Sequence, residues 1–430
     1  MSSIDMTHPE EARIDWRTVA RTLSLETRPF IDGAFVESTS PERILDINPA
    51  TESLLVSMPA GSVEDVDAAV KAGRRAFVDG RWSRLAPQAR RDVLVRFERL
   101  FCEHRNELAL LDCLDVGKPI TQALAEVEMA CGYLRFAAEA CDKLSNDLFP
   151  SDPRLLAFNV LEPVGVVGAI VPWNFPMVVV ALKIAPALAC GNSVVLKPSE
   201  LSPLSALRIA ALALEAGLPP GILNIVPGAG APVGRAIAEH PDVDMLTFTG
   251  STATGLALLR ATGASTLKKL VLECGGKSPH IVFEDASDLD VVADDVVEQI
   301  TWNQGQVCIA SSRLLVQCSI HAQLVERVVT RMRRIQPGDP MDPATTFGPL
   351  VSRAQLDKVA GYVNAARRAG VRLLTGGSRP ERKGFYFEPT VFDEVAPEQK
   401  IAREEIFGPV LSTFTFKTPE EAVRIANSST

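Results

Sequence analysis

The spacing of apolar residues changes near residue 164, and the change separates two kinds of segment. Before it, apolar positions recur with the period of a helix, which predicts helices over 63–77, 86–115 and 120–144. Gly117, Lys118 and Pro119 break this pattern. A short strand pair is expected at 30–35, because Asp32-Gly33 is a typical hairpin turn. Residues 1 to about 28 are expected to form an irregular or helical arm.

After residue 164, short β-branched runs alternate with helical segments, which predicts βαβ units and a parallel sheet covered on both faces. The expected strands are 164–171, 194–196, 222–226 and 245–249, and the expected helices are 176–190, 203–216, 231–240 and 251–261. A second α/β unit is expected from about 278, with strands at 280–283, 314–317, 371–374 and 411–416 and helices at 289–303, 322–335 and 353–369.

Polar or glycine-containing motifs directly follow four of the expected strands. They are Pro172-Trp173-Asn174, Lys197-Pro198-Ser199-Glu200, Pro227-Gly228 and Gly250-Ser251. In open α/β sheets, ligands bind outside the carboxyl ends of the strands. The four motifs therefore predict one shared ligand crevice.

The composition narrows the possible functions. A formal net charge of −9 with no long basic run gives no support for nucleic-acid binding. Residues 163–182 are uncharged, but Pro172 and Pro176 would break a membrane helix, so no membrane contact is expected. Without a secretion signal, the eight cysteines are expected to be reduced and the chain to be cytoplasmic. The five histidines show no metal-ligand spacing, so no metal site is predicted.

Cys308, Glu273 and Asn174 carry the strongest candidate chemistry. A thiol is a strong nucleophile toward a carbonyl carbon, and a carboxylate can activate the water that releases the attached group. Asn174 lies between two prolines that hold its amide rigidly, as an oxyanion donor requires. Each residue also has a plainer interpretation: a buried apolar cysteine, a surface carboxylate and an Asn-mediated turn.

The surroundings of these residues favour the chemical interpretation. Glu273 is expected at the end of a buried strand, next to Gly275 and Gly276, where a base could swing. The Gln and Gly residues before Cys308 predict a turn that brings the backbone close to a ligand. Cys274 is expected to point to the opposite side of an extended segment and to serve in packing.

Taken in chain order, these segments resemble the NAD(P)-dependent aldehyde dehydrogenase family. The resemblance runs from about Phe30 to the last residue, and it also rests on Lys197-Pro198-Ser199-Glu200, Phe248-Thr249-Gly250-Ser251 and Glu404-Glu405-Ile406-Phe407-Gly408-Pro409-Val410. It implies an α/β fold with a Rossmann-type parallel cofactor-binding sheet, a second α/β catalytic domain and a small oligomerisation β-segment. The implied parts are an N-terminal arm (1–28), the NAD-binding domain (29–150 and 163–275), an oligomerisation segment (151–162) and the catalytic domain (276–430).

The resemblance also implies roles for single residues. Cys308 attacks the aldehyde, Asn174 and the backbone N–H of Cys308 hold the oxyanion, and Glu273 activates water. NAD is the implied cofactor, and the residues expected to bind it are Val171, Pro172, Trp173, Lys197, Ser199, Glu200, Gly230, Gly250, Ser251, Thr254, Glu405 and Phe407. Glu200 can accept hydrogen bonds from ribose hydroxyls and repels a 2′-phosphate, which favours NAD over NADP.

A substrate pocket is implied at Phe175, Leu182 and Trp302. Leu182 stands where related enzymes usually carry Trp, so a wider aldehyde tunnel is expected. Segments 28–33 and 337–346 are closer to bacterial broad-specificity enzymes of polyamine breakdown, such as γ-glutamyl-γ-aminobutyraldehyde dehydrogenase. This similarity implies an aliphatic or aminoaldehyde substrate and a homodimer or homotetramer.

Family members continue beyond residue 430, so the catalytic domain is expected to be incomplete at its C-terminal end. Two other functions stay open at this point. One is a CoA-acylating aldehyde dehydrogenase, against which Glu273 argues as a water-activating base. The other is an inactive NAD-binding fragment.

Overall fold

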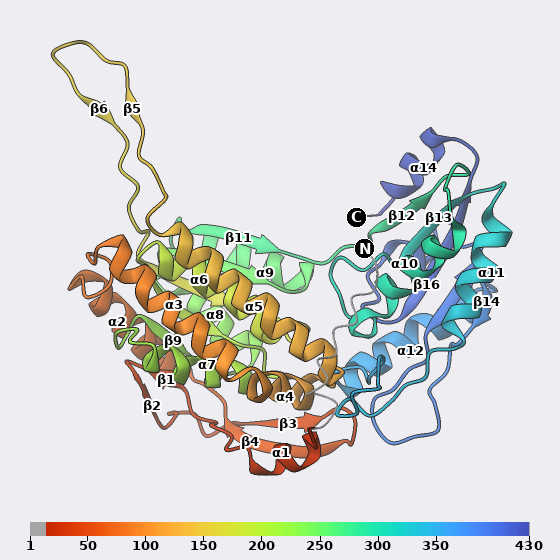
Figure 1. Cartoon of the computed structure of the whole chain (residues 1–430), viewed down its shortest axis with the longest axis horizontal. Helices are drawn as coiled ribbons and strands as arrows, with labels where there is room; N and C mark the ends of the chain where they lie inside the picture. The colour runs from red at the N-terminus through yellow and green to blue at the C-terminus, as the bar shows by residue number, and fades with distance from the viewer. Residues whose placement is uncertain (1–13, 430) are drawn as a thin grey trace.

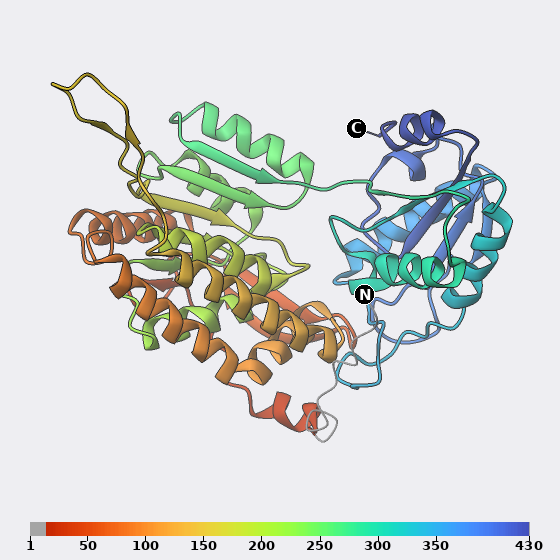
Figure 2. The same cartoon turned by 45° about the horizontal axis from the view of Figure 1, so that its top comes forward.

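Residues 14–429 are described by the computed structural model, and they form two lobes that are each built around a β-sheet (Figure 1). The larger lobe holds a seven-stranded sheet and the smaller lobe a five-stranded sheet. Figure 2 shows the segment that follows the last strand of the larger sheet crossing from one lobe to the other. Residues 1–13 of the expected arm lie outside the described residues.

The larger sheet has the strand order β11-β10-β7-β8-β9-β1-β2. Its parallel strands are β7 (Val166–Ile170), β8 (Ser193–Lys197), β9 (Leu223–Ile225), β10 (Met245–Thr249) and β11 (Lys269–Glu273). The antiparallel pair β1 (Phe30–Ile31) and β2 (Ala34–Phe35) extends it beyond β9. Because the chain returns across β7 to form β10, the strand order reverses between these two strands, which is where such sheets bind ligands.

Helices cover both faces of this sheet, as the alternating pattern predicts. Alternate side chains of β7 enter different cores, Val166 and Ile170 on one side and Ala169 on the other. The helices on the first side are α2 (Val63–Val78), α8 (Arg235–Glu239) and α9 (Thr252–Gly263). Those on the second side are α3 (Pro87–Glu103), α4 (Arg105–Val116), α5 (Ile120–Ala140), α6 (Pro176–Ala189) and α7 (Leu204–Glu215).

The smaller sheet runs in the order β12 (Pro279–Val282), β13 (Arg313–Gln317), β16 (Val410–Phe416), β15 (Thr390–Asp393) and β14 (Arg372–Thr375). Neighbouring strands are parallel except β14 and β15. Its helices are α10 (Leu289–Thr301), α11 (His321–Met332), α12 (Arg353–Arg368), α13 (Lys400–Arg403) and α14 (Pro419–Ala426). The sequence pattern does not predict β15, because a buried run of four residues gives too short a periodic signal.

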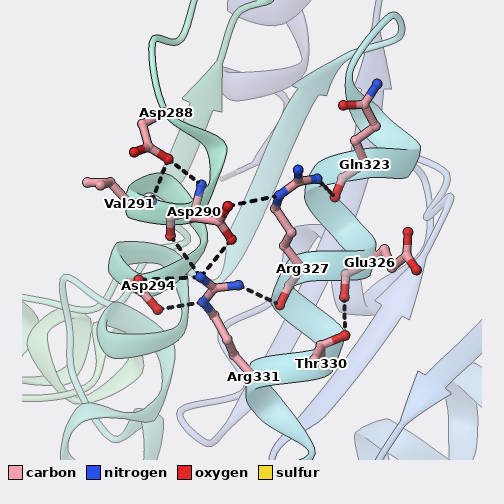
Figure 3. Close-up of polar contacts among 9 residues, drawn as sticks. All are labelled: Asp288, Asp290, Val291, Asp294, Gln323, Glu326, Arg327, Thr330 and Arg331. Atoms are coloured by element: carbon pink, nitrogen blue, oxygen red, sulfur yellow. Dashed lines mark hydrogen bonds and ion pairs between the residues drawn. The ribbon is translucent and has the colours of Figure 1, made fainter.

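Helices α10 and α11 are joined by exposed ion pairs (Figure 3). Arg331 pairs with Asp290 at 2.9 Å and with Asp294, and Arg327 lies 3.5 Å from Asp290. Asp288 caps α10 by accepting hydrogen bonds from backbone N–H groups of its first turn. The side chains of Asp290 and Asp294 are 61% and 68% exposed, and ion pairs this exposed add little stability.

Two antiparallel hairpins lie outside the main sheets. β3 (Arg43–Asn48) pairs with β4 (Ser53–Pro59), near α1 (Trp16–Thr22). β5 (Leu148–Phe149) pairs with β6 (Ala157–Phe158) in an arm that projects away from the larger lobe (Figure 1). This arm contains most of the segment expected to serve in oligomerisation.

Three expectations about elements are wrong in detail. The helix expected over 86–115 is two helices, because His104 leaves the helical conformation with φ −97° and ψ 20°. The helix expected over 231–240 begins with a π-helical turn at Gly230–Gly234. Glu273 does not end a buried strand: β11 forms the edge of its sheet, so Val271 and Glu273 are exposed.

Candidate active site

Cys308 and Glu273 line one cleft although they belong to different lobes. The cleft has a volume of about 630 Å³ and is lined also by Leu182 and Lys183 of α6 and by Thr249 of β10. Glu273 ends β11, and Cys308 follows the 3-10 turn Trp302–Gly305 at the end of α10. The predicted nucleophile and the predicted base are therefore brought together by the approach of the two lobes.

Asn174 is bonded to the segment that carries Cys308. Its side-chain Nδ2 donates to the Gln306 carbonyl at 2.9 Å, and its own carbonyl accepts from Asn303 Nδ2 at 2.9 Å. Asn174 is only 5% exposed, so these contacts fix its orientation. The amide has a second N–H group, which an oxyanion formed at Cys308 can use.

Left-handed backbone precedes Cys308. Asn303, Gln304 and Gly305 have φ values of 46°, 56° and 68°. Consecutive left-handed residues are costly for L-amino acids, so the surrounding structure must hold them. Gln304 is fully buried. With the oxygen and nitrogen of its side-chain amide exchanged, the oxygen accepts from the Gly348 N–H at 3.1 Å and the nitrogen donates to the Pro349 carbonyl at 3.3 Å. The turn predicted before the nucleophile is present, in a strained form typical of functional sites.

The surroundings of Cys308 disfavour its thiolate. Burial raises the pKa of the Cys308 thiol, and the nearby charges of Glu405 and Glu273 raise it further. The backbone N–H groups of Cys308 and Ile309 act in the opposite direction and lower this pKa. A base that accepts the thiol proton therefore helps the thiol to act as a nucleophile.

A second cleft, of about 690 Å³, lies between α8 and α9. Gly230 and Thr254 line it together with apolar side chains of α9 such as Leu258. Ser251 caps α9, because its Oγ accepts from the Thr254 backbone N–H at 3.2 Å. A capped helix start beside an apolar cleft suits the phosphates and the adenine of a dinucleotide.

Lys197 and Glu200 form an ion pair at the end of β8. Lys197 is 3% exposed, and its Nζ donates to the Pro198 carbonyl at 2.9 Å and lies 3.4 Å from Glu200. Burial lowers the pKa of Lys197, and the charge of Glu200 raises it. The Glu200 side chain is 44% exposed and can be reached by ribose hydroxyls. The Ser199 hydroxyl is engaged within its own turn, where it accepts from the Leu201 N–H at 3.2 Å.

Glu405 and Phe407 approach the larger lobe from the smaller one. The Phe407 ring lies 5.3 Å from the Trp173 ring, edge to face, and its backbone is left-handed with φ 60°. Glu405 accepts from the Gly276 N–H at 3.2 Å, so its carboxyl lies against the segment that follows Glu273. Burial raises the pKa of Glu405. Predicted cofactor residues of the two lobes thus meet where the lobes approach each other, and the charge of Glu405 acts on the nearby Cys308.

The other predicted site residues differ in their exposure and contacts. Leu182 is 40% exposed and lines the Cys308 cleft, whereas Phe175 and Trp302 pack on each other with ring centres 5.1 Å apart. The backbone N–H groups of Val171 and Gly250 donate to the carbonyls of Lys197 and Glu273, on neighbouring strand ends, at 3.1 and 3.0 Å. Pro172 directly follows Val171 at the end of β7.

Two other kinds of feature are absent from the described part of the chain. Within residues 14–429, no three His, Cys, Asp or Glu side chains are grouped closely enough to hold a metal ion. None of the described helices combines the length and apolar character needed to cross a bilayer.

Comparison with known proteins decides the family. The sequence profile of the aldehyde dehydrogenase family matches residues 35–430. The chain belongs to the aldehyde dehydrogenase family. Aminoacetaldehyde dehydrogenase of Pseudomonas aeruginosa is 44% identical to it over 419 residues, which cover 97% of this chain and 84% of the relative.

Solved structures of aldehyde dehydrogenases share the fold. A γ-glutamyl-γ-aminobutyraldehyde dehydrogenase from Burkholderia cenocepacia is 48% identical, with a TM-score of 0.94 over 96% of this chain and 84% of that one. An indole-3-acetaldehyde dehydrogenase in complex with NAD⁺ is 46% identical, with a TM-score of 0.95 over the same shares. The α/β fold and the resemblance stated from the sequence are therefore confirmed, and the protein is an oxidoreductase that acts on aldehydes.

Sequence reasoning missed three polar side chains at the site of this aldehyde dehydrogenase. Lys183 lines the cleft; burial lowers its pKa and the charge of Glu273 raises it. Lys118 and Asn303 both donate to the Asn174 carbonyl, at 3.0 and 2.9 Å. The place of Lys118 between two apolar helical segments could have predicted a buried lysine with a specific partner, since lysine is almost never buried unpaired.

Proposed function

We propose that this protein oxidises an aldehyde to the carboxylic acid with reduction of NAD, through a covalent bond to Cys308. The observation that carries the proposal is the shared cleft of Cys308 and Glu273, with the Asn174 amide bonded to the segment before the cysteine. Nucleophile, base and oxyanion donor are the groups that acyl chemistry at a thiol requires.

The strand-end residues fit NAD. The cleft between α8 and α9 would hold the adenine, and the start of α9 would receive the phosphates. The exposed carboxylate of Glu200 would accept hydrogen bonds from ribose hydroxyls, and a 2′-phosphate there would meet its negative charge. Glu405 and Phe407 would hold the nicotinamide end, beside Trp173.

Cys308 attacks the aldehyde carbon as thiolate, and the oxyanion of the thiohemiacetal accepts hydrogen bonds from Asn174 Nδ2 and from the backbone N–H of Cys308. When bound, NAD supplies the acceptor for the hydride that leaves this carbon, so that a thioester remains. Glu273 then takes a proton from water, and the water oxygen attacks the thioester carbonyl. The carbon–sulfur bond breaks, the acid leaves, and the Cys308 thiolate is restored.

We infer an aliphatic or amino-substituted aldehyde as the substrate. The relatives named for aminoacetaldehyde and γ-glutamyl-γ-aminobutyraldehyde support this class. Leu182 supports it too, because it leaves more room in the cleft than a tryptophan would. We also propose that the protein is cytoplasmic. We further propose that it forms a homodimer or homotetramer, which the exposed apolar side chains of the β5–β6 arm support.

The test is NADH absorbance with short aliphatic aldehydes and aminoaldehydes, with NAD or NADP, and with or without CoA. Cys308→Ala should lower turnover by more than about 10³-fold and leave NADH binding unchanged in a fluorescence titration. Cys318→Ala, an exposed cysteine at the end of β13, is the matched control and should keep full activity. Turnover retained by Cys308→Ala would remove this cysteine from the mechanism, and product formation that requires CoA would favour the acylating alternative.

A further inference from the structure

Lys118 lies between α4 and α5 with a fully buried side chain. Its Nζ pairs with both carboxyl oxygens of Glu126 and lies 4.2 Å from the centre of the Phe175 ring. An ammonium group removed from water is costly, so it must be held by strong contacts with the protein. The position of this charge is therefore fixed by its neighbours.

Lys118 also donates to the main-chain carbonyl of Asn174, at 3.0 Å. The same oxygen accepts from Asn303 Nδ2 at 2.9 Å, while the side chain of Asn174 donates to the Gln306 carbonyl at 2.9 Å. Asn174 is thus held through its main-chain carbonyl and through its side-chain amide, and a rotation of its peptide group would break the two contacts at the carbonyl. These contacts together set the direction in which the Asn174 amide points.

Stability alone does not explain a lysine at this position. Two buried carboxyl groups face it: burial raises the pKa of Asp112 to about 6 and that of Glu126 to about 7, and Lys118 lowers both. Buried ion pairs can often be replaced by apolar side chains without loss of stability. An apolar residue at 118 would, however, remove one of the two donors that hold the Asn174 carbonyl.

We propose that Lys118 is a positioning residue for the oxyanion step: by holding the Asn174 carbonyl, it aims the Asn174 amide at the oxygen that becomes negative when Cys308 attacks. This inference rests on the proposed function. Loss of an oxyanion donor costs about 10²–10³-fold in rate. A donor that is present but badly aimed should therefore cost about 10–10²-fold in the first turnover.

The experiment compares Lys118→Met, Glu126→Gln and the double variant with the wild type. Lys118→Met leaves a carboxyl group buried without its partner, and the double variant removes that carboxylate as well. The double variant should regain most of the stability lost in Lys118→Met. Its first-turnover NADH formation, measured by stopped flow, should stay about 10–10²-fold slow, with NADH binding unchanged. Arg208→Met breaks the 2.8 Å pair with Glu107 and should lower stability without slowing the first turnover.

A double variant that regains the wild-type rate together with its stability would overturn the proposal, because only the ion pair would then matter. Equal slowing in Arg208→Met would also overturn it. A crystal structure of the double variant gives a readout independent of activity: the Asn174 amide is expected to leave the Gln306 carbonyl, and an unchanged contact contradicts the proposal. A wild type that forms no NADH from any aldehyde contradicts the proposed function instead, and the crystallographic comparison still decides the role of Lys118.

Discussion

At the scale of single residues, two carboxyl groups act on the thiol of Cys308. Glu273 and Glu405 both raise the pKa of Cys308, which burial has already raised, so the thiol is a weak acid before substrate arrives. Glu273 lines the same cleft and is exposed to solvent, so it can reach water as well as the thiol. It is therefore a candidate base for thiol activation and for thioester hydrolysis.

Replacing Glu273 by Gln separates these two roles. If the carboxylate acts mainly on water, the first turnover should keep its NADH burst while steady turnover falls by about 10²-fold. Stopped-flow absorbance measures both phases in one experiment. If the burst disappears while iodoacetamide still titrates Cys308, Glu273 is needed to take the thiol proton, and the hydrolytic role alone is wrong.

At the scale of elements, a left-handed turn after α10 precedes the candidate nucleophile Cys308. Gly305 has φ 68°, and a Cβ atom added to it would lie 2.4 Å from the Gly408 carbonyl group. Gly305→Ala therefore faces both backbone strain and a collision with backbone. We expect a loss of more than about 2 kcal/mol in the free energy of unfolding, together with most of the activity.

Gly370→Ala is the matched control for this prediction. Gly370 has φ 76°, but an added Cβ atom would meet no heavy atom within 4 Å. It should lose only about 1 kcal/mol, the cost of the left-handed backbone. Urea unfolding and NADH formation on both variants provide the comparison, and equal losses of stability would show that contact with Gly408 is unimportant.

Helix α4 supports neighbouring helices through buried carboxyl groups. Asp115 accepts from the Leu204 N–H at 3.1 Å, at the start of α7. Asp46 of β3 is also buried, and burial raises the pKa of Asp46 to about 7 and that of Asp115 well above its usual value. Asp46 has a pKa of about 3.9 in an unfolded chain. The folded protein therefore binds more protons between these values, and the stability from this group is full below about pH 4 and is lost as pH rises through about 7.

Asp46→Asn removes this titration. Between pH 5 and pH 8, the free energy of unfolding of the variant should rise by on the order of 1–3 kcal/mol relative to that of the wild type, because only the wild type has the Asp46 carboxyl, which becomes a buried charge as pH rises. Urea unfolding at three pH values measures the difference, and Glu64→Gln, an exposed change on α2, serves as the control. Parallel stability profiles for Asp46→Asn and the wild type would show that Asp46 keeps an ordinary pKa.

Elements with a strong local signal could be predicted from the sequence. The period of apolar residues located β10 and α12 closely, and the polar or glycine-containing motifs follow the ends of β7, β8, β9 and β10 as expected. The edge position of β11 could not be predicted, because strand order depends on contacts between distant segments. The contact of Lys118 with Asn174 was missed for the same reason, since it joins two loops that are far apart in the chain.

At the scale of the whole molecule, the site needs both lobes. Cys308, Glu405 and Phe407 belong to the smaller lobe, and Asn174 and Glu273 to the larger one. Contacts across the boundary, such as the hydrogen bond from the Gly276 N–H to Glu405, join the two lobes at the candidate site. Local sequence patterns could predict candidate residues in each lobe, but the way the two sets are brought together depends on tertiary packing.

The β5–β6 arm is the feature of the whole molecule that bears on assembly. Leu148 and Phe158 pair across its two strands and are 69% and 55% exposed, and Leu155, Leu156 and Leu161 are exposed nearby. Apolar side chains gathered on a projecting hairpin are typical of a surface that another chain covers.

Replacing both Leu148 and Phe158 by Lys should lower the molar mass in sedimentation velocity toward that of one chain, with thermal unfolding nearly unchanged. Val78→Lys, which places the same charge at an apolar residue 59% exposed on α2, should leave the molar mass unchanged. If the wild type sediments as the proposed oligomer and the arm variant keeps the same mass, the arm does not hold that oligomer together.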